Sequence, residues 1–157
     1  MLGIDGQYVS YALAGFTGAD RRMQKKGVFN GATVYDDYAH HPDELRATIE
    51  AVRGMHPKRL VVAFQPHTYT RTSALFADFV EELKKVDVAV VAEIYAARER
   101  NTIGISSRDL CAEVPGSIYC ATLQDVTAYL QENAQPGDVI LTVGAGDIYK
   151  AGEALLK

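Results

Sequence analysis

Residues 59–95, RLVVAFQPHTYTRTSALFADFVEELKKVDVAVVAEIY, decide the fold. They begin with a continuous apolar run over 59–64, which is typical of a strand buried on both faces. Apolar residues then recur at helical spacing, at Phe76, Phe79, Val80 and Leu83. A second apolar run follows over 86–95. This order of strand, helix and strand predicts a βαβ unit with two parallel strands.

The same alternation continues on both sides of this unit. Upstream, a strand pattern in ATVYDDY (32–38) precedes a helical pattern over 43–54. Downstream we expect a short helix over 106–114 with Ser106 as N-cap, followed by a weaker strand in SIYCA (117–121). Leu123, Val126 and Leu130 then mark one face of another helix. A strand over 138–146 follows, and Ile148, Gly152 and Leu155 lie on one face of a last helix. The sequence therefore predicts a three-layer α/β domain of nucleotide-binding type, with a mostly parallel sheet of about six strands.

The N-terminal part of the chain follows a different pattern. Residues 21–37, RRMQKKGVFNGATVYDD, predict a hairpin, because Asn30-Gly31 between alternating apolar residues favours a type I′ turn. This hairpin would add an antiparallel edge to the sheet. Residues 1–20 show no strand of their own, and we expect them to be the end of a preceding domain and its linker. The domain itself is predicted to span 21–157.

Composition excludes several classes of function. The 157 residues are 48% hydrophobic and 23% charged, which is ordinary for one globular domain. The net charge of −4 gives no basic excess for sequence-independent binding of nucleic acid. No run approaches 18 apolar residues, so we expect no membrane span, and the start lacks the features of a signal peptide. The two cysteines form no CxxC pair. We therefore expect a cytoplasmic protein.

Three polar motifs follow three of the predicted strands. They are DDYAHHP (36–42), QPHTYTRT (65–72) and EIYAARERNTIG (93–104). Open α/β sheets bind ligands beyond the carboxyl ends of their strands, so the three loops are expected to meet at one edge. Their convergence is stronger evidence for a site than any single motif.

The motif DDYAHHP allows three readings. As a structural turn, His41 would cap a helix, Pro42 would take the first helical position, and acidic residues would follow in the first turn. A metal site formed by the histidines is a second reading, although adjacent histidines do not easily ligate one ion. The third is a loop that faces a ligand. It alone accounts for Asp36, Asp37, Tyr38 and His40, so we favour a motif that both starts a helix and faces a ligand.

The other loops suggest anion binding. Arg71 can bind a carboxylate or phosphate through two hydrogen bonds, and His67 can donate to the same anion. A helix capped by Thr72 or Ser73 would leave both side chains free. The stretch GAGDI (144–148), with Asp147 as a possible N-cap, is similar to a phosphate-binding turn but lacks the third glycine, and the chain contains no GxxxxGK[ST] motif. Loops without a complete catalytic apparatus predict one domain of a multidomain enzyme.

Five segments carry a family resemblance. RRMQKKG, VYDDYAHHPDEL, FQPHTYTRT, IYAARE and VGAGDI, in this order and spacing, resemble the C-terminal, Rossmann-like domain of the bacterial peptidoglycan Mur ligases over roughly residues 12–157. DDYAHHP is also similar to the murein-peptide ligase of cell-wall recycling, whereas FQPHTYTRT favours the alanine-adding members. Departures are Thr68, where many members carry arginine, and Met23, where phenylalanine is frequent and where we expect a change in packing.

The resemblance implies an ATP-dependent ligase that joins L-alanine to UDP-N-acetylmuramate. ATP phosphorylates the muramate carboxylate, and the alanine amine attacks the acyl phosphate. In this family an N-terminal and a central domain precede the C-terminal one, and these would be its partners. ATP and Mg²⁺ would be bound mainly by the central domain. The resemblance thus implies no metal site here and no turnover by this chain alone.

The resemblance also implies roles for individual residues. Arg22 would meet the phosphates of ATP, and Asp36, Asp37 and Tyr38 would contact the nucleotide. The incoming amino acid and the muramoyl carboxylate would lie near His40, His67, Tyr69 and Arg71. Of these residues, Arg22, His40 and Arg71 would be catalytic. Two other classes stay open: a standalone nucleotide- or anion-binding module, and a metal-dependent hydrolase that uses the Asp-Asp and His-His pairs.

Overall fold

The computed structural model describes residues 19–157, so nearly all of the predicted linker at 1–20 lies outside the described residues. Six strands form one sheet in the order β1-β2-β6-β3-β4-β5. All neighbouring strands are parallel except β1 and β2, which pair antiparallel. The predicted fold class is confirmed. The strands are β1 (Gln24–Phe29), β2 (Ala32–Asp37), β3 (Arg59–Phe64), β4 (Val88–Ala92), β5 (Ile118–Cys120) and β6 (Asp138–Val143).

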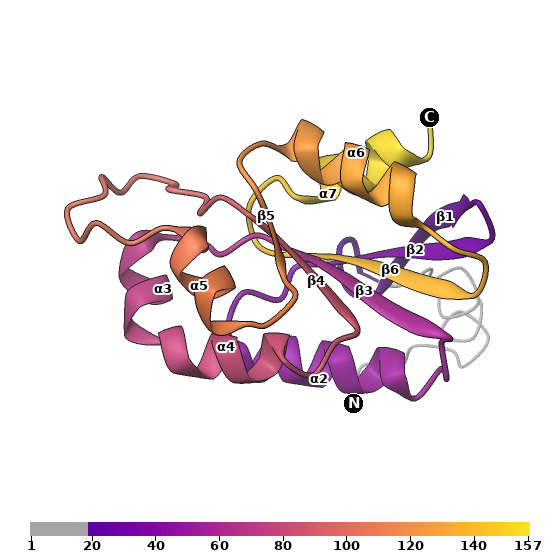
Figure 1. Cartoon of the computed structure of the whole chain (residues 1–157), viewed down its shortest axis with the longest axis horizontal. Coiled ribbons are helices and arrows are strands. Elements are labelled where there is room, and N and C mark those ends of the chain that lie inside the picture. Colours follow the sequence, from indigo (N-terminus) through magenta and orange to yellow (C-terminus); the bar gives the residue numbers. More distant parts are fainter. Residues whose placement is uncertain (1–18) are drawn as a thin grey trace, which may run out of the picture.

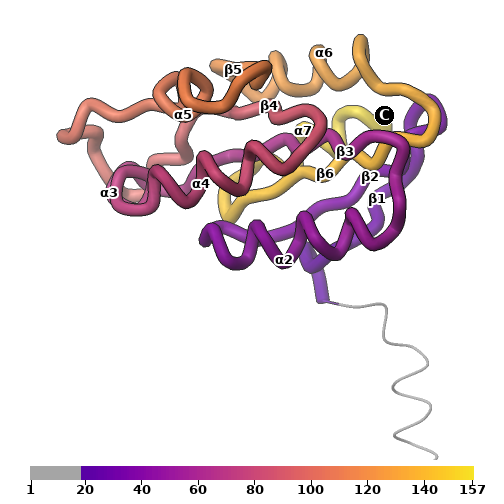
Figure 2. Tube along the Cα trace, turned by 60° about the horizontal axis from the view of Figure 1, so that its bottom comes forward, coloured from indigo at the N-terminus to yellow at the C-terminus, as the bar shows by residue number. Residues whose placement is uncertain are grey.

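Helices cover both faces of the sheet (Figure 1). They are α2 (Pro42–Arg53), α3 (Tyr69–Ala74), α4 (Phe76–Leu83), α5 (Ser107–Glu113), α6 (Leu123–Asn133) and α7 (Tyr149–Leu155). Side chains of α2, α4 and α5 share one buried cluster with one face of the sheet, and those of α6 and α7 share a second cluster with the other face. Figure 2 is turned toward the layer that contains α2 and α4.

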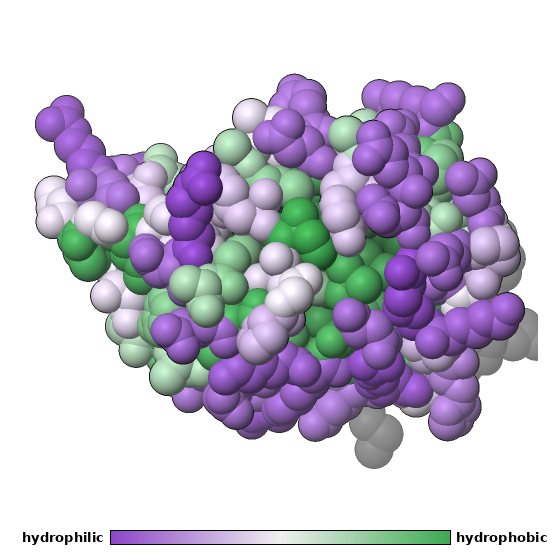
Figure 3. Space-filling model, in the orientation of Figure 1, coloured by the Kyte–Doolittle hydropathy of each residue, from purple (hydrophilic) through white to green (hydrophobic). Residues whose placement is uncertain are grey.

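The central strand β6 shows why the sheet holds together. Every residue of β6 is buried, and its side chains alternate between the two clusters: Leu141 and Val143 pack on the α2 side, Ile140 on the α6 side. Such two-sided burial explains the continuous apolar run in its sequence. On the face that Figure 3 shows, hydrophobic side chains gather in the middle, with hydrophilic ones above and below them.

The predicted hairpin is confirmed. Asn30 and Gly31 have φ of 48° and 78°, the two positive values that a type I′ turn requires. Other boundaries differ from the sequence-based expectation. The strands predicted over 86–95 and 138–146 end at Ala92 and Val143, because the residues that follow leave the sheet to build loops. Among residues 19–157, no helix is long and apolar enough to cross a bilayer.

The strand order creates the place for a site. The loops after β2 and β3 lead to helices on the α2 side, whereas the loop after β6, which lies between them, leads to α7 on the opposite side. Connections that diverge to opposite faces leave a crevice at the carboxyl ends of the strands. Two such crevices flank β6, and the polar motifs of the sequence border both.

Candidate functional site

The start of α2 positions the DDYAHHP loop. The amide of Asp43 donates to Nδ1 of His41 at 3.3 Å, and the carboxylate of Glu44 accepts from the amides of His41 and His40 at 3.2 and 2.9 Å. Pro42 occupies the first helical turn, where its missing N–H is no loss. The structural part of this motif is thus confirmed: His41 is the N-cap.

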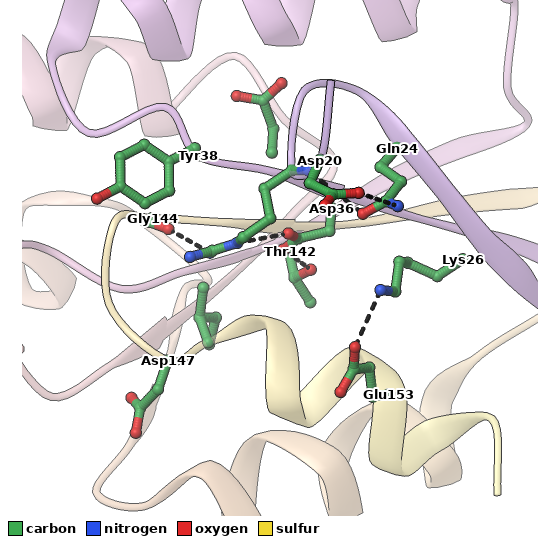
Figure 4. Close-up of polar contacts among 12 residues, drawn as sticks. Asp20, Gln24, Lys26, Asp36, Tyr38, Thr142, Gly144, Asp147 and Glu153 are labelled. Atoms are coloured by element: carbon green, nitrogen blue, oxygen red, sulfur yellow. Dashed lines mark hydrogen bonds and ion pairs between the residues drawn. The ribbon is translucent and has the colours of Figure 1, made fainter. Parts of the chain in front are cut away.

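Arg21 fills the crevice between β2 and β6. Its Nε donates to Asp36 at 2.8 Å, and its two terminal nitrogens donate to the carbonyl oxygens of Gly146 and Gly144 at 3.1 and 2.6 Å. The guanidinium lies 4.9 Å from the ring centroid of Tyr38 and 4.6 Å from that of Tyr149, a cation–π arrangement. Figure 4 shows the Gly144 carbonyl near the Tyr38 ring and Asp36 next to Thr142.

Both aspartates of the motif accept hydrogen bonds from other residues of the domain. Asp36 is fully buried and also accepts from the Thr142 hydroxyl at 2.7 Å. Asp37 accepts from the amides of Met23 and Ala39, each at 2.8 Å. Direct contact of Asp36 with a nucleotide, as expected from the resemblance, conflicts with this burial. Its role is instead to hold Arg21. Met23 packs against the core cluster on the α2 side, as expected for a packing position.

Gln65 fills the second crevice, between β6 and β3. Its side-chain oxygen accepts from the amides of Asp147 and Ile148 at 3.0 and 3.1 Å, and its Nε2 donates to Asp147 at 3.2 Å. These amides are the groups that a phosphate would need in the GAGDI turn. The similarity of GAGDI to a phosphate-binding turn is therefore superficial. Asp147 does not cap α7 either, since the N-cap position belongs to Ile148 without a side-chain hydrogen bond.

Four rings extend across the edge from one loop to the next. The ring centroids of Tyr38 and His40 lie 5.5 Å apart, those of His40 and His67 6.2 Å, and those of His67 and Tyr95 5.5 Å. Tyr38 and Tyr95, at the ends of the row, are 38% and 37% exposed. The row therefore brings the three predicted loops together on a surface that a planar or polar ligand can reach.

Two nitrogens at this edge, one on His67 and one on Arg71, lack a partner among residues 19–157. Nδ1 of His67 and Nη1 of Arg71 are buried, and neither forms a hydrogen bond within residues 19–157. Buried polar groups in folded proteins are nearly always paired, so these two nitrogens at the carboxyl edge of the sheet are candidates for contact with a ligand. Burial lowers the pKa of His67 below 6.5, and the charges of Arg71 and His40 lower it further. The imidazole is thus neutral at pH 7.

Two further residues were predicted to belong to the site, Tyr69 and Arg22. Tyr69 is half-buried in the first turn of α3, two residues before Arg71. Arg22 is exposed. Burial alone would raise the pKa of Glu44, but hydrogen bonds from the His40 and His41 amides and the charges of His40 and Arg22 lower it. The predicted cap at Thr72 or Ser73 is wrong, because α3 begins at Tyr69, earlier than its polarity suggested.

The described part of the chain contains no group of side chains that could bind a metal ion together. No group of three or more histidine, cysteine, aspartate and glutamate residues is close enough there to hold an ion. His40 is instead turned to the Tyr38 carbonyl, 3.1 Å from Nδ1, and His41 to its own helix. The hydrolase reading requires such a donor set, so residues 19–157 give it no support.

Sequence reasoning missed four residues that shape the site. Arg21 and Gln65 fill the two crevices, and Tyr95 and Glu99 reach the row from the loop after β4. The motif IYAARE held the signal for the last two, since an aromatic and an acidic residue follow a buried strand there. Arg21 could not be distinguished from Arg22 by residue type.

Comparisons with known proteins agree with this architecture. Residues 21–146 match the family model described as Mur ligase, glutamate ligase domain. The chain is 49% identical to a UDP-N-acetylmuramate–L-alanine ligase of Lachnospira eligens over 99% of its own length and 35% of that protein. It thus spans about a third of the curated relatives that it matches.

Solved structures share the fold. A UDP-N-acetylmuramate-alanine ligase from Thermotoga maritima superposes with a TM-score of 0.76 at 26% identity, over 99% of this chain and 33% of that one. A murein peptide ligase from Psychrobacter arcticus gives a TM-score of 0.69 at 21% identity, over 99% of this chain and 33% of that one. The second likeness shows the fold alone.

Proposed function

Because the chain belongs to the Mur ligase family, we propose that it is the C-terminal domain of an ATP-dependent ligase that joins L-alanine to UDP-N-acetylmuramate. The observation that carries this proposal is the pair of orphaned nitrogens on His67 and Arg71 at the carboxyl edge of the sheet. Each of the two substrates to be joined carries a carboxylate, and a guanidinium beside a neutral imidazole suits a carboxylate. The name carried by the 49% identical relative supports the choice of L-alanine.

The domain would contribute positioning and charge to the reaction. Arg71 would bind a substrate carboxylate, and His67, neutral at the outset, would donate a hydrogen bond to it. His40 would lie beside the same group, because its ring neighbours that of His67. Holding the amine and the activated carboxyl together lowers the barrier through orientation, which is the main requirement of phosphoryl and acyl transfer.

The nucleotide would be shared with another domain. Tyr38 offers an exposed ring to it, and the exposed Arg22 offers a cation for its phosphates. Arg21 and Gln65 occupy the crevices where a self-sufficient nucleotide-binding domain would hold its ligand. This argues against a standalone nucleotide-binding module. The described residues also offer no donor set for Mg²⁺, whose protein ligands we place in the central domain.

Phosphate release by the full-length ligase tests this function. With ATP and UDP-N-acetylmuramate present, release should depend on L-alanine, and Arg71→Lys should raise KM for a carboxylate substrate by at least about tenfold, because lysine cannot form the two-pronged hydrogen bond. Arg53→Lys, at the far end of α2, is the matched control. Preference for a tripeptide over L-alanine would identify a murein-peptide ligase instead. Phosphate release by the 157-residue chain alone would contradict the domain assignment.

A further inference from the structure

Glu99 joins two loops of the site. It lies in the loop between β4 and α5, yet its carboxylate accepts from the amide of Thr70 at 3.0 Å and from the Thr70 hydroxyl. Thr70 is the second residue of α3 and immediately precedes Arg71. Hydrogen bonds from Thr70 lower the pKa of Glu99, so the carboxylate is charged at neutral pH. A charged acceptor therefore holds the turn of α3 that carries Arg71.

The contact continues through the backbone. The Thr68 amide donates to the Tyr95 carbonyl at 2.9 Å, and the Tyr95 amide donates to the Pro66 carbonyl at 2.8 Å. Between these bonds, the His67 and Tyr95 rings stack with an interplanar angle of 26°. Residues 66–70 are thus tied at several points to the loop after β4.

The first turn of α3 is held from outside the helix. Helices α2, α5 and α6 are each capped by the side chain of the residue before them, whereas α3, like α4 and α7, begins without a side-chain cap. Thr68 also has φ of 69°, a value that a β-branched residue rarely adopts. Since helix ends leave amides unsatisfied, the carboxylate of Glu99 takes the role of the missing cap from another loop.

We propose that Glu99 is a positioning residue that holds His67 and Arg71 in the geometry in which they bind a substrate carboxylate. The inference deepens the proposed ligase function and rests on it for the identity of that substrate. Glu99 itself would not touch the substrate, because its carboxylate is already occupied by Thr70. Its removal would free the first turn of α3, so Arg71 would sample several positions and bind the carboxylate less often.

Kinetics of the full-length ligase provide the first test. Glu99→Gln removes the charge but keeps the shape, and Asp109→Asn is its matched control, because Asp109 caps α5 by accepting from the Ser106 amide at 2.8 Å. We expect Glu99→Gln to raise KM for L-alanine or UDP-N-acetylmuramate by about tenfold, with a smaller change in kcat, and Asp109→Asn to stay within about twofold. Thr70→Val should raise the same KM, and adding Glu99→Gln to it should have little further effect.

A second measurement separates this inference from the ligase assignment. In the 157-residue chain, NMR signals of the His67 ring and the Arg71 side chain should shift or broaden in Glu99→Gln and stay unchanged in Asp109→Asn. If both variants left those signals and the KM values alike, the positioning role would be refuted while the ligase function stood. If the full-length protein did not use L-alanine, the proposed function would fail, and the NMR comparison would still decide the role of Glu99.

Discussion

Replacing Arg21 by methionine should destabilise the domain far more than the same change at Arg22. Arg21 neutralises Asp36, whose side chain is 0% exposed, and satisfies two carbonyl oxygens of the loop after β6. Removing one partner of a buried ion pair costs about 3–5 kcal/mol. The Arg21 side chain is itself 21% exposed, so water can partly solvate the carboxylate left behind, and we expect the lower end, about 3 kcal/mol.

Unfolding of the 157-residue chain, followed by circular dichroism in urea and on heating, measures this cost. For a domain of this size, 3 kcal/mol corresponds to a fall in Tm of roughly 6–12 °C. Arg22→Met removes an exposed side chain and should change stability by no more than about 0.5 kcal/mol. Adding Asp36→Asn to Arg21→Met should recover part of the loss, because the uncompensated charge is then gone. Equal losses at positions 21 and 22, or no recovery in the double variant, would refute the reasoning.

Three further predictions concern the site and its supports. Because the pKa of His67 is lowered in the folded chain, the unfolded chain binds a proton more readily, and the free energy of unfolding should fall as the pH drops below 6.5. Arg71→Gln removes a positive charge near His67 and should raise the pKa of His67 in an NMR titration. Burial raises the pKa of Cys120 to about 11, so its thiol should react with a disulfide reagent at pH 8 far more slowly in the folded chain than after unfolding. Gly144→Ala should destabilise the domain more than Gly116→Ala. A Cβ at Gly144 would lie 2.6 Å from the carbonyl oxygen of Gln65, whereas a Cβ at Gly116 would meet nothing within 4 Å. Chemical denaturation of both variants measures the difference.

Local patterns predicted the elements well. The apolar runs of β3 and β6, the helical stripe of α2 and the Asn30-Gly31 turn are each encoded by neighbouring residues, and the structure contains all of them. The convergence of three loops also followed from a general property of parallel sheets. The expectation that DDYAHHP both starts a helix and lines the edge therefore needed no long-range information.

Other features depend on contacts between distant residues. Arg21 turns inward and Arg22 does not, in a segment where Arg21 and Met23 have positive φ of 55° and 43°, and residue type reveals neither feature. The glycines of GAGDI resembled a phosphate loop, but Gly144 is needed because the chain there passes close to Gln65. The motif IYAARE marked Glu99 as part of a loop at the edge, but it did not reveal the partner Thr70, which is 29 residues away.

Hydrogen bonds join residues 21–23 to the DDYAHHP loop. The Tyr38 amide donates to the Arg21 carbonyl at 2.7 Å, and the Met23 amide donates to the Asp37 carboxylate at 2.8 Å. Because these bonds run in both directions between the two segments, a substitution that displaces residues 21–23 should displace the Tyr38 ring as well.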